Sequence, residues 1–171
     1  MAPLDVGLLI LRVVLGLLLV GHASQKLLGL FRGKGIAGTA GLFEASGLRP
    51  GVPLVIAAGL TELGGAGLLV LGLATPLAVS MVLGAMAVAI STLWSKGLWG
   101  HLGGYEVPFC YALMAFVLGV TGPGAFSLDA LAPWSGAHGL PWALGALAVA
   151  LLLSSPLIVM VMRHSRAHGE A

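Results

Sequence analysis

The chain has 171 residues, of which 58% are hydrophobic and only 8% are charged, and its mean hydropathy is +1.06. Water-soluble domains carry about 25% charged residues, so this composition excludes that class and indicates an integral membrane protein surrounded by lipid. The net charge is +2, and the basic residues form no stripe that could follow a phosphate backbone, which argues against nucleic acid as a partner. The single cysteine, Cys110, excludes a disulfide or a CxxC redox pair within one chain.

Five apolar runs follow one another, and each has close to the roughly 20 residues that a helix needs to span a bilayer. They cover about residues 4–30, 53–73, 76–94, 105–121 and 139–162, and the fourth is the shortest. The runs lack the alternation of barrel strands, and lipid excludes open sheet edges, so the spans are predicted to be helices. The sequence therefore predicts an all-α integral membrane helical bundle, in a single membrane domain over residues 1–171.

The basic residues predict how this bundle is oriented. With five spans, all of them but Arg12 fall on one side of the membrane, namely Lys26, Arg32, Lys34, Arg49, Lys96, Arg163 and Arg166. The positive-inside rule then places the N-terminus outside and the C-terminus in the cytoplasm. In the loop 32–49, apolar residues recur at near-helical spacing, so a short helix at the membrane surface is expected there.

The first apolar run carries Arg12, His22, Gln25 and Lys26. A charged group at the centre of a bilayer-spanning helix costs about 2.5 to 3.5 kcal/mol on insertion scales. At 100° per residue, Arg12 and Lys26 share one stripe of the helix and His22 lies close to it. That side is expected to face other helices, because lipid would leave these groups without partners.

Helical rise places other polar residues at matching depths. Glu62 in the second run comes level with His22, and Glu106 at the start of the fourth run comes level with Lys26. If the first, second and fourth spans are neighbours, six residues line one polar pocket in the cytoplasmic half of the membrane: His22, Gln25, Lys26, Glu62, Tyr105 and Glu106. Three of them, His22, Glu62 and Glu106, are candidate catalytic groups because they can move protons. Arg12, Gln25, Lys26 and Tyr105 are candidate binding residues.

Arg12 needs an anionic partner, and two carboxylates are alternative candidates for this ion pair. Glu62 lies in the second run, and Asp129 lies in the outer loop. Glu62 is slightly favoured, because a buried carboxylate needs a partner more than one in a loop does. Such a pair would be structural. No spacing of histidines and carboxylates predicts a metal site, and His22 is the one well-buried candidate for a haem ligand.

A set of short motifs runs through the chain in a fixed order: Arg12, Gly16, Gly21-His22 and Gln25-Lys26; Glu62 with Gly64-Gly65; Gly72-Leu73-Ala74-Thr75; Gly103-Gly104-Tyr105-Glu106; Gly122-Pro123-Gly124; and Ser127-Leu128-Asp129. In order and spacing they resemble the DoxX family of small bacterial membrane proteins, over about residues 8–130. The resemblance implies a four-helix membrane bundle in the bacterial cell membrane. To that DoxX-like core this chain adds a C-terminal fifth transmembrane helix.

The resemblance also implies a function. Members of the family are described as membrane oxidoreductases linked to thiosulfate and quinone chemistry, to quinone or catechol resistance, and to oxidative-stress complexes with superoxide dismutase and a sulfurtransferase. In one respect this sequence departs from the family pattern, because Leu93 occupies the place of a histidine late in the third span.

We therefore expect a membrane subunit of a quinone-linked oxidoreductase or oxidative-stress complex, with a quinone as the cofactor. A quinone site needs hydrogen-bond donors to carbonyl oxygens and an acid or base, which His22, Lys26, Glu62 and Glu106 can supply. Electrons would come from other redox subunits, since the sequence shows no flavin, haem or iron–sulfur motif. The alternatives are a non-enzymatic membrane anchor or scaffold for soluble redox enzymes, and a small-solute or proton pathway.

Overall fold

The computed structural model describes residues 2–169, and within them every regular element is a helix. The six α-helices are α1 (Pro3–Leu28), α2 (Gly35–Ala45), α3 (Gly51–Leu71), α4 (Thr75–Leu93), α5 (Glu106–Thr121) and α6 (Leu140–His168). Three single turns of 3-10 helix lie in the loops: η1 (Trp94–Lys96), η2 (Gly100–Leu102) and η3 (Asp129–Leu131). The predicted all-α bundle is confirmed, and α2 is the short helix expected in the loop 32–49.

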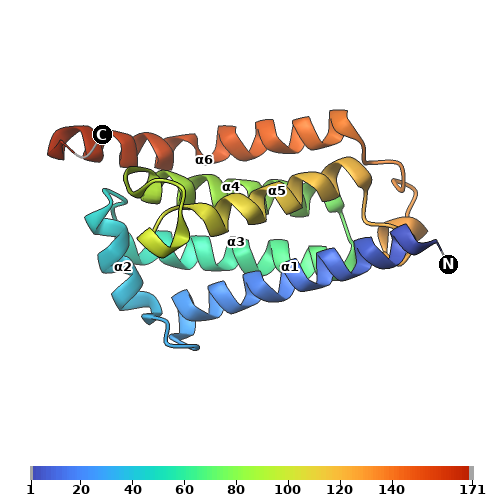
Figure 1. Ribbon diagram of the computed structural model, residues 1–171, viewed down its shortest axis with the longest axis horizontal. Helices are drawn as coiled ribbons and strands as arrows, with labels where there is room; N and C mark the ends of the chain where they lie inside the picture. Colours follow the sequence, from blue (N-terminus) through green and yellow to red (C-terminus); the bar gives the residue numbers. More distant parts are fainter. Residues whose placement is uncertain (1, 170–171) are drawn as a thin grey trace.

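The long helices have the length and composition of membrane spans. Four of them, α1, α3, α4 and α6, are long and apolar enough to cross a bilayer. The apolar helix α5 has only 16 residues, about 24 Å at 1.5 Å per residue, so it is shorter than a hydrocarbon core of about 30 Å. In Figure 1 these five helices run along one long axis, with the two termini at opposite ends. Their arrangement agrees with five passes, while the orientation in the membrane stays a prediction.

Helix α4 is the centre of the bundle, because it packs against α3, α5 and α6. A first cluster of buried side chains joins α4 to α1, α3 and α5, and includes Leu15, Leu19, Ala66, Val82 and Leu118. A second, smaller cluster joins α4 to α6 through Val79, Leu83, Ala146 and Ala150. The C-terminal helix therefore covers one side of a core made by the other spans.

Helices α1 and α3 approach closely at Gly16. A Cβ added at Gly16 would lie 2.6 Å from the side chain of Val70 and 3.0 Å from the carbonyl oxygen of Ala66. Small residues allow such close approach between membrane helices. The contact fixes how α1 is aligned along α3, and it places Arg12, one turn earlier, beside the end of α3.

Candidate functional site

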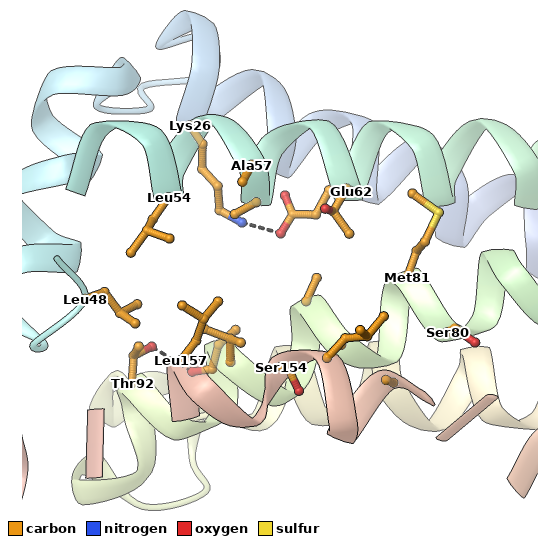
Figure 2. Close-up of a pocket in the computed structure, with 18 of the residues that line it drawn as sticks. Lys26, Leu48, Leu54, Ala57, Glu62, Ser80, Met81, Thr92, Ser154 and Leu157 are labelled. Carbon is orange, nitrogen blue, oxygen red and sulfur yellow. Dashed lines mark hydrogen bonds and ion pairs between the residues drawn. The ribbon is translucent and has the colours of Figure 1, made fainter. Parts of the chain in front are cut away.

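A cavity of about 470 Å³ lies between α3, α4 and α6 (Figure 2). Its walls are largely aliphatic, and Phe43 and Leu48 from α2 and the following loop lie at one end. The volume falls within the range of about 300 to 1,000 Å³ that is typical of small-molecule pockets, which are likewise mostly apolar with a few polar groups.

An ion pair between Lys26 of α1 and Glu62 of α3 forms the polar part of the cavity wall (Figure 2). Nζ of Lys26 donates to Oε1 of Glu62, and the side chains are 24% and 2% exposed. The second carboxylate oxygen, Oε2, is buried and has no hydrogen-bond partner among residues 2–169. A bare carboxylate is costly at this depth, so the lysine stabilises it.

The hydroxyl groups of the cavity wall add little polarity. Ser80 donates to the carbonyl of Pro76 at 2.8 Å, and Thr92 donates to that of Ala89 at 2.8 Å. Such bonds to the preceding turn satisfy a hydroxyl within its own helix. Ser154 of α6 differs, because its buried hydroxyl lines the cavity and has no hydrogen-bond partner among residues 2–169. The charged groups of the cavity wall are Lys26 and Glu62.

The cavity is not in the place of the polar pocket predicted between the first, second and fourth spans, although His22 still lies close enough to Lys26 and Glu62 to interact electrostatically with them. Of the six residues expected in that pocket, only Lys26 and Glu62 line the cavity, which lies between the second, third and fifth spans. His22 points toward α5, where its Nε2 lies 3.4 Å from the hydroxyl of Tyr111 and the two rings meet edge to face. Helical rise sets the depth of a residue, but neighbours also depend on the side of the helix that it occupies.

Gln25 and Tyr105 have local partners instead. Nε2 of Gln25 donates to the carbonyl of Phe31 at 3.5 Å, in the turn after α1. Tyr105 stacks on Trp94, with ring centroids 5.2 Å apart and planes inclined by 4°. Both residues help to hold the loops at one end of the bundle.

Glu106 binds the backbone of the loop that precedes its own helix. Its Oε2 accepts a hydrogen bond of 2.8 Å from the backbone N–H of Gly100, in η2. The carboxylate fixes the connection between α4 and α5 and does not reach the cavity. Its position in the first turn of α5 also suits the positive end of a helix dipole.

The expected ion pair between Arg12 and Glu62 is wrong, and Asp129 does not replace it. Within the described residues, the partners of Arg12 are two backbone carbonyls: its Nη1 donates to Val70 at 2.9 Å and to Leu69 at 3.4 Å. Arg12 is only 2% exposed. The last carbonyls of a helix lack partners within it and carry partial negative charge, so the end of α3 stabilises the guanidinium.

Asp129 holds the start of α4. Its carboxylate accepts four hydrogen bonds: from the backbone N–H of Ala74 and of Thr75 at 2.8 Å each, from the Thr75 hydroxyl at 2.7 Å, and from the Trp134 indole at 2.9 Å. Burial raises the pKa of this carboxyl, but the four hydrogen bonds together lower the pKa by more than burial raises it. The net pKa is therefore below its ordinary value. Asp129 is therefore a cap supplied from a distant loop.

Gly72, in the turn between α3 and α4, lies between these two structural groups. It has a φ of +61°, and an added Cβ would collide with Arg12 on one side and Ser127 on the other. The backbone N–H of Asp129 also donates to the Gly72 carbonyl at 2.9 Å. Two motifs that the sequence showed separately, residues 72–75 and 127–129, thus meet at one place. Gly72, Thr75 and Trp134 had not been expected there. The motif 72–75 was the available signal for Gly72 and Thr75, whereas Trp134 belongs to no motif.

Comparison with known proteins shows which part of the chain matches a known family. The DoxX family model matches residues 7–95, just over half of the chain. The matched segment contains most of α1 and the whole of α2, α3 and α4, and so both members of the Lys26–Glu62 pair. It does not extend over the remainder of the expected resemblance up to residue 130, or over α6. No curated protein and no solved structure matches the chain.

Proposed function

This chain belongs to the DoxX family of membrane proteins, and on that premise we propose that it is a membrane subunit of a quinone-linked oxidoreductase. The observation that carries the proposal is the apolar cavity with a buried ion pair in its wall. A pocket that binds a flat, apolar ring with two carbonyl oxygens needs aliphatic walls and a small number of polar groups. Lys26 and Glu62 supply those groups.

Lys26 and Glu62 have complementary capacities toward such a ring. The Lys26 ammonium has three N–H donors and uses one on Glu62, so it can also donate to a carbonyl oxygen. The Glu62 carboxyl group, which lines the cavity, can accept a hydrogen bond when ionised and can donate one when protonated. A buried cation beside a carbonyl oxygen also stabilises negative charge that develops there.

The chemistry must balance in electrons and protons. A quinone becomes a quinol when it takes up two electrons and two protons, and the electrons would come from a redox protein that docks on this subunit. Glu62, in its protonated form, would release the proton of its carboxyl group to a carbonyl oxygen, and Lys26 would stabilise the carboxylate that remains. Reprotonation of Glu62 would then allow the second transfer.

The same cavity weakens the case for a purely structural scaffold. A scaffold would be expected to pair all its buried polar groups and to fill its core, because an unpaired buried group destabilises the fold. Among the described residues, three buried side-chain atoms lack partners, Arg12 Nε, Glu62 Oε2 and Ser154 Oγ, and both Glu62 and Ser154 line a cavity large enough for a ligand. The binding function accounts for the cavity and for the polar residues in its wall.

The test is to purify the protein in lipid nanodiscs, extract bound quinone, and identify it by mass spectrometry. Wild-type protein is expected to retain stoichiometric quinone, and Glu62→Gln to retain at least tenfold less. Glu106→Gln is the matched control, since it makes the same change in a carboxylate outside the cavity. The proposal fails if wild-type protein retains no quinone even when quinone is added in excess.

A further inference from the structure

The cavity opens at its side, between α3 and α6. Both helices pack against α4, and within residues 2–169 they make no substantial contact with each other. Leu77 of α4 and Leu153 of α6 line the cavity, yet 54% and 74% of their surfaces remain exposed. Because α3, α4 and α6 are membrane spans, the exposed side of this opening faces lipid.

The end of the cavity nearest α2 is obstructed. Phe43 of α2 and Leu48 of the next loop line it there, and Leu48 is only 1% exposed. Lys26 occupies the neighbouring wall, held by Glu62. A ligand coming from the water at this end would have to displace packed side chains, whereas the opening between α3 and α6 needs no displacement of helices.

Polarity falls from the inner wall toward the opening. The ion pair lies on the α1 and α3 side, and Glu62 is 2% exposed. On the α6 side, the lining residues are Val149, Ala150, Leu153, Ser154 and Leu157, which are aliphatic apart from one serine. A ligand that fits this gradient has a polar ring at Glu62 and an apolar part that continues outward past Leu153.

We infer that the ligand enters from the lipid phase between α3 and α6, and that it carries a long apolar tail that leaves the cavity through the same gap. This inference rests on the proposed function and narrows it to quinones with an isoprenoid tail. Leu153 and Leu77 then form the mouth of the site, and they contact the tail rather than the ring.

Two neighbouring leucines of α6 provide the test. Leu152 and Leu153 are 72% and 74% exposed, but only Leu153 lines the cavity. Wild-type protein, Leu153→Trp and Leu152→Trp are compared in nanodiscs with two fully substituted benzoquinones, one with a polyisoprenyl tail and tetramethyl-benzoquinone without a tail. Retained quinone is measured by mass spectrometry. Leu153→Trp is expected to weaken binding of the tailed quinone at least tenfold, while the tailless ring binds as in wild-type protein and Leu152→Trp behaves as wild type.

Three outcomes would contradict the inference in different ways. Equal binding of the tailed quinone by Leu153→Trp and Leu152→Trp would overturn the route between α3 and α6 and leave the proposed function in place. Equal loss of both quinones in Leu153→Trp would place the ring, not the tail, at Leu153. Binding of neither quinone by wild-type protein would overturn the proposed function itself.

Discussion

Arg12 of α1 and Val70 of α3 are joined by a 2.9 Å hydrogen bond from the guanidinium to the backbone carbonyl. The bond links the first span to the end of the second without any carboxylate. It also explains how a 2% exposed arginine is stabilised inside a bundle of apolar helices. The charge is matched by the negative end of a helix dipole.

Replacement of Arg12 tests this structural role. Arg12→Met should lower the free energy of unfolding by about 1.5 to 3 kcal/mol, the usual value of a hydrogen bond to a charged group. Thermal unfolding in detergent would measure the loss, with the exposed Arg32→Met as the control. Quinone retained per folded molecule should not change, since Arg12 does not line the cavity. A selective loss of quinone in a fully stable variant would point to a role in binding.

The Lys26–Glu62 pair can be tested by a double-mutant cycle. Lys26→Met leaves a buried carboxylate without its cation, which costs about 3 to 5 kcal/mol for buried pairs. The lower end is expected, because the Lys26 side chain is 24% exposed. Adding Glu62→Gln to Lys26→Met should restore part of the lost stability, because it removes the stranded charge. Additive losses in the cycle would mean that the two side chains do not interact.

Asp129 makes the stability depend on pH at the acid end. Its folded pKa lies below the ordinary value of 3.8, so its contribution is fully present above that value and is lost as the pH falls through the folded pKa. In Asp129→Asn, thermal stability should be lower near pH 6 and should change less than wild type between pH 5 and pH 3. An unchanged pH profile would show that the bonds to Ala74, Thr75 and Trp134 do not depend on the charge.

His22 and Glu62 should respond differently to substitution. Both were expected in one pocket, but His22 contacts Tyr111 on α5 and only Glu62 lines the cavity. Glu62→Gln should therefore lower quinone-dependent electron transfer at least tenfold, and His22→Ala should lower it much less. The assay needs the electron-donating partner and equal amounts of each variant in the membrane. An equally large loss in His22→Ala would restore this residue to the catalytic group.

The orientation of the bundle can be tested by labelling. The distribution of lysine and arginine predicts a cytoplasmic C-terminus. A cysteine placed at His168, in a Cys110→Ser background because Cys110 is exposed, should resist an impermeant reagent added to the outside of intact cells. It should react after the membrane is opened. Rapid labelling in intact cells would reverse the topology.

The helices and their approximate ends could be predicted, because long apolar runs bounded by Gly and Pro leave few choices in a membrane. The pairing of Lys26 with Glu62 was within reach, since both residues were assigned to one pocket by depth. The cavity itself could not be predicted. Its walls are mostly Ala, Leu and Val, and the sequence pattern of such residues is the same whether they face lipid, a neighbouring helix or an empty space.

The partner of Arg12 was missed for another reason. A search among side chains finds only carboxylates as anions. The groups that bind Arg12 are backbone carbonyls at the end of a helix, and every residue of the sequence has such a carbonyl. The alignment set by Gly16 decides which backbone carbonyls come within reach, and that alignment depends on how two helices fit together.

The helix α6 lies outside the segment shared with the DoxX family, yet it forms one of the three walls of the cavity. The segment matched by the family model thus carries Lys26 and Glu62, and a helix beyond that segment shapes the space in front of them. A change in the final helix alone would therefore alter the shape of the cavity and leave its ion pair in place.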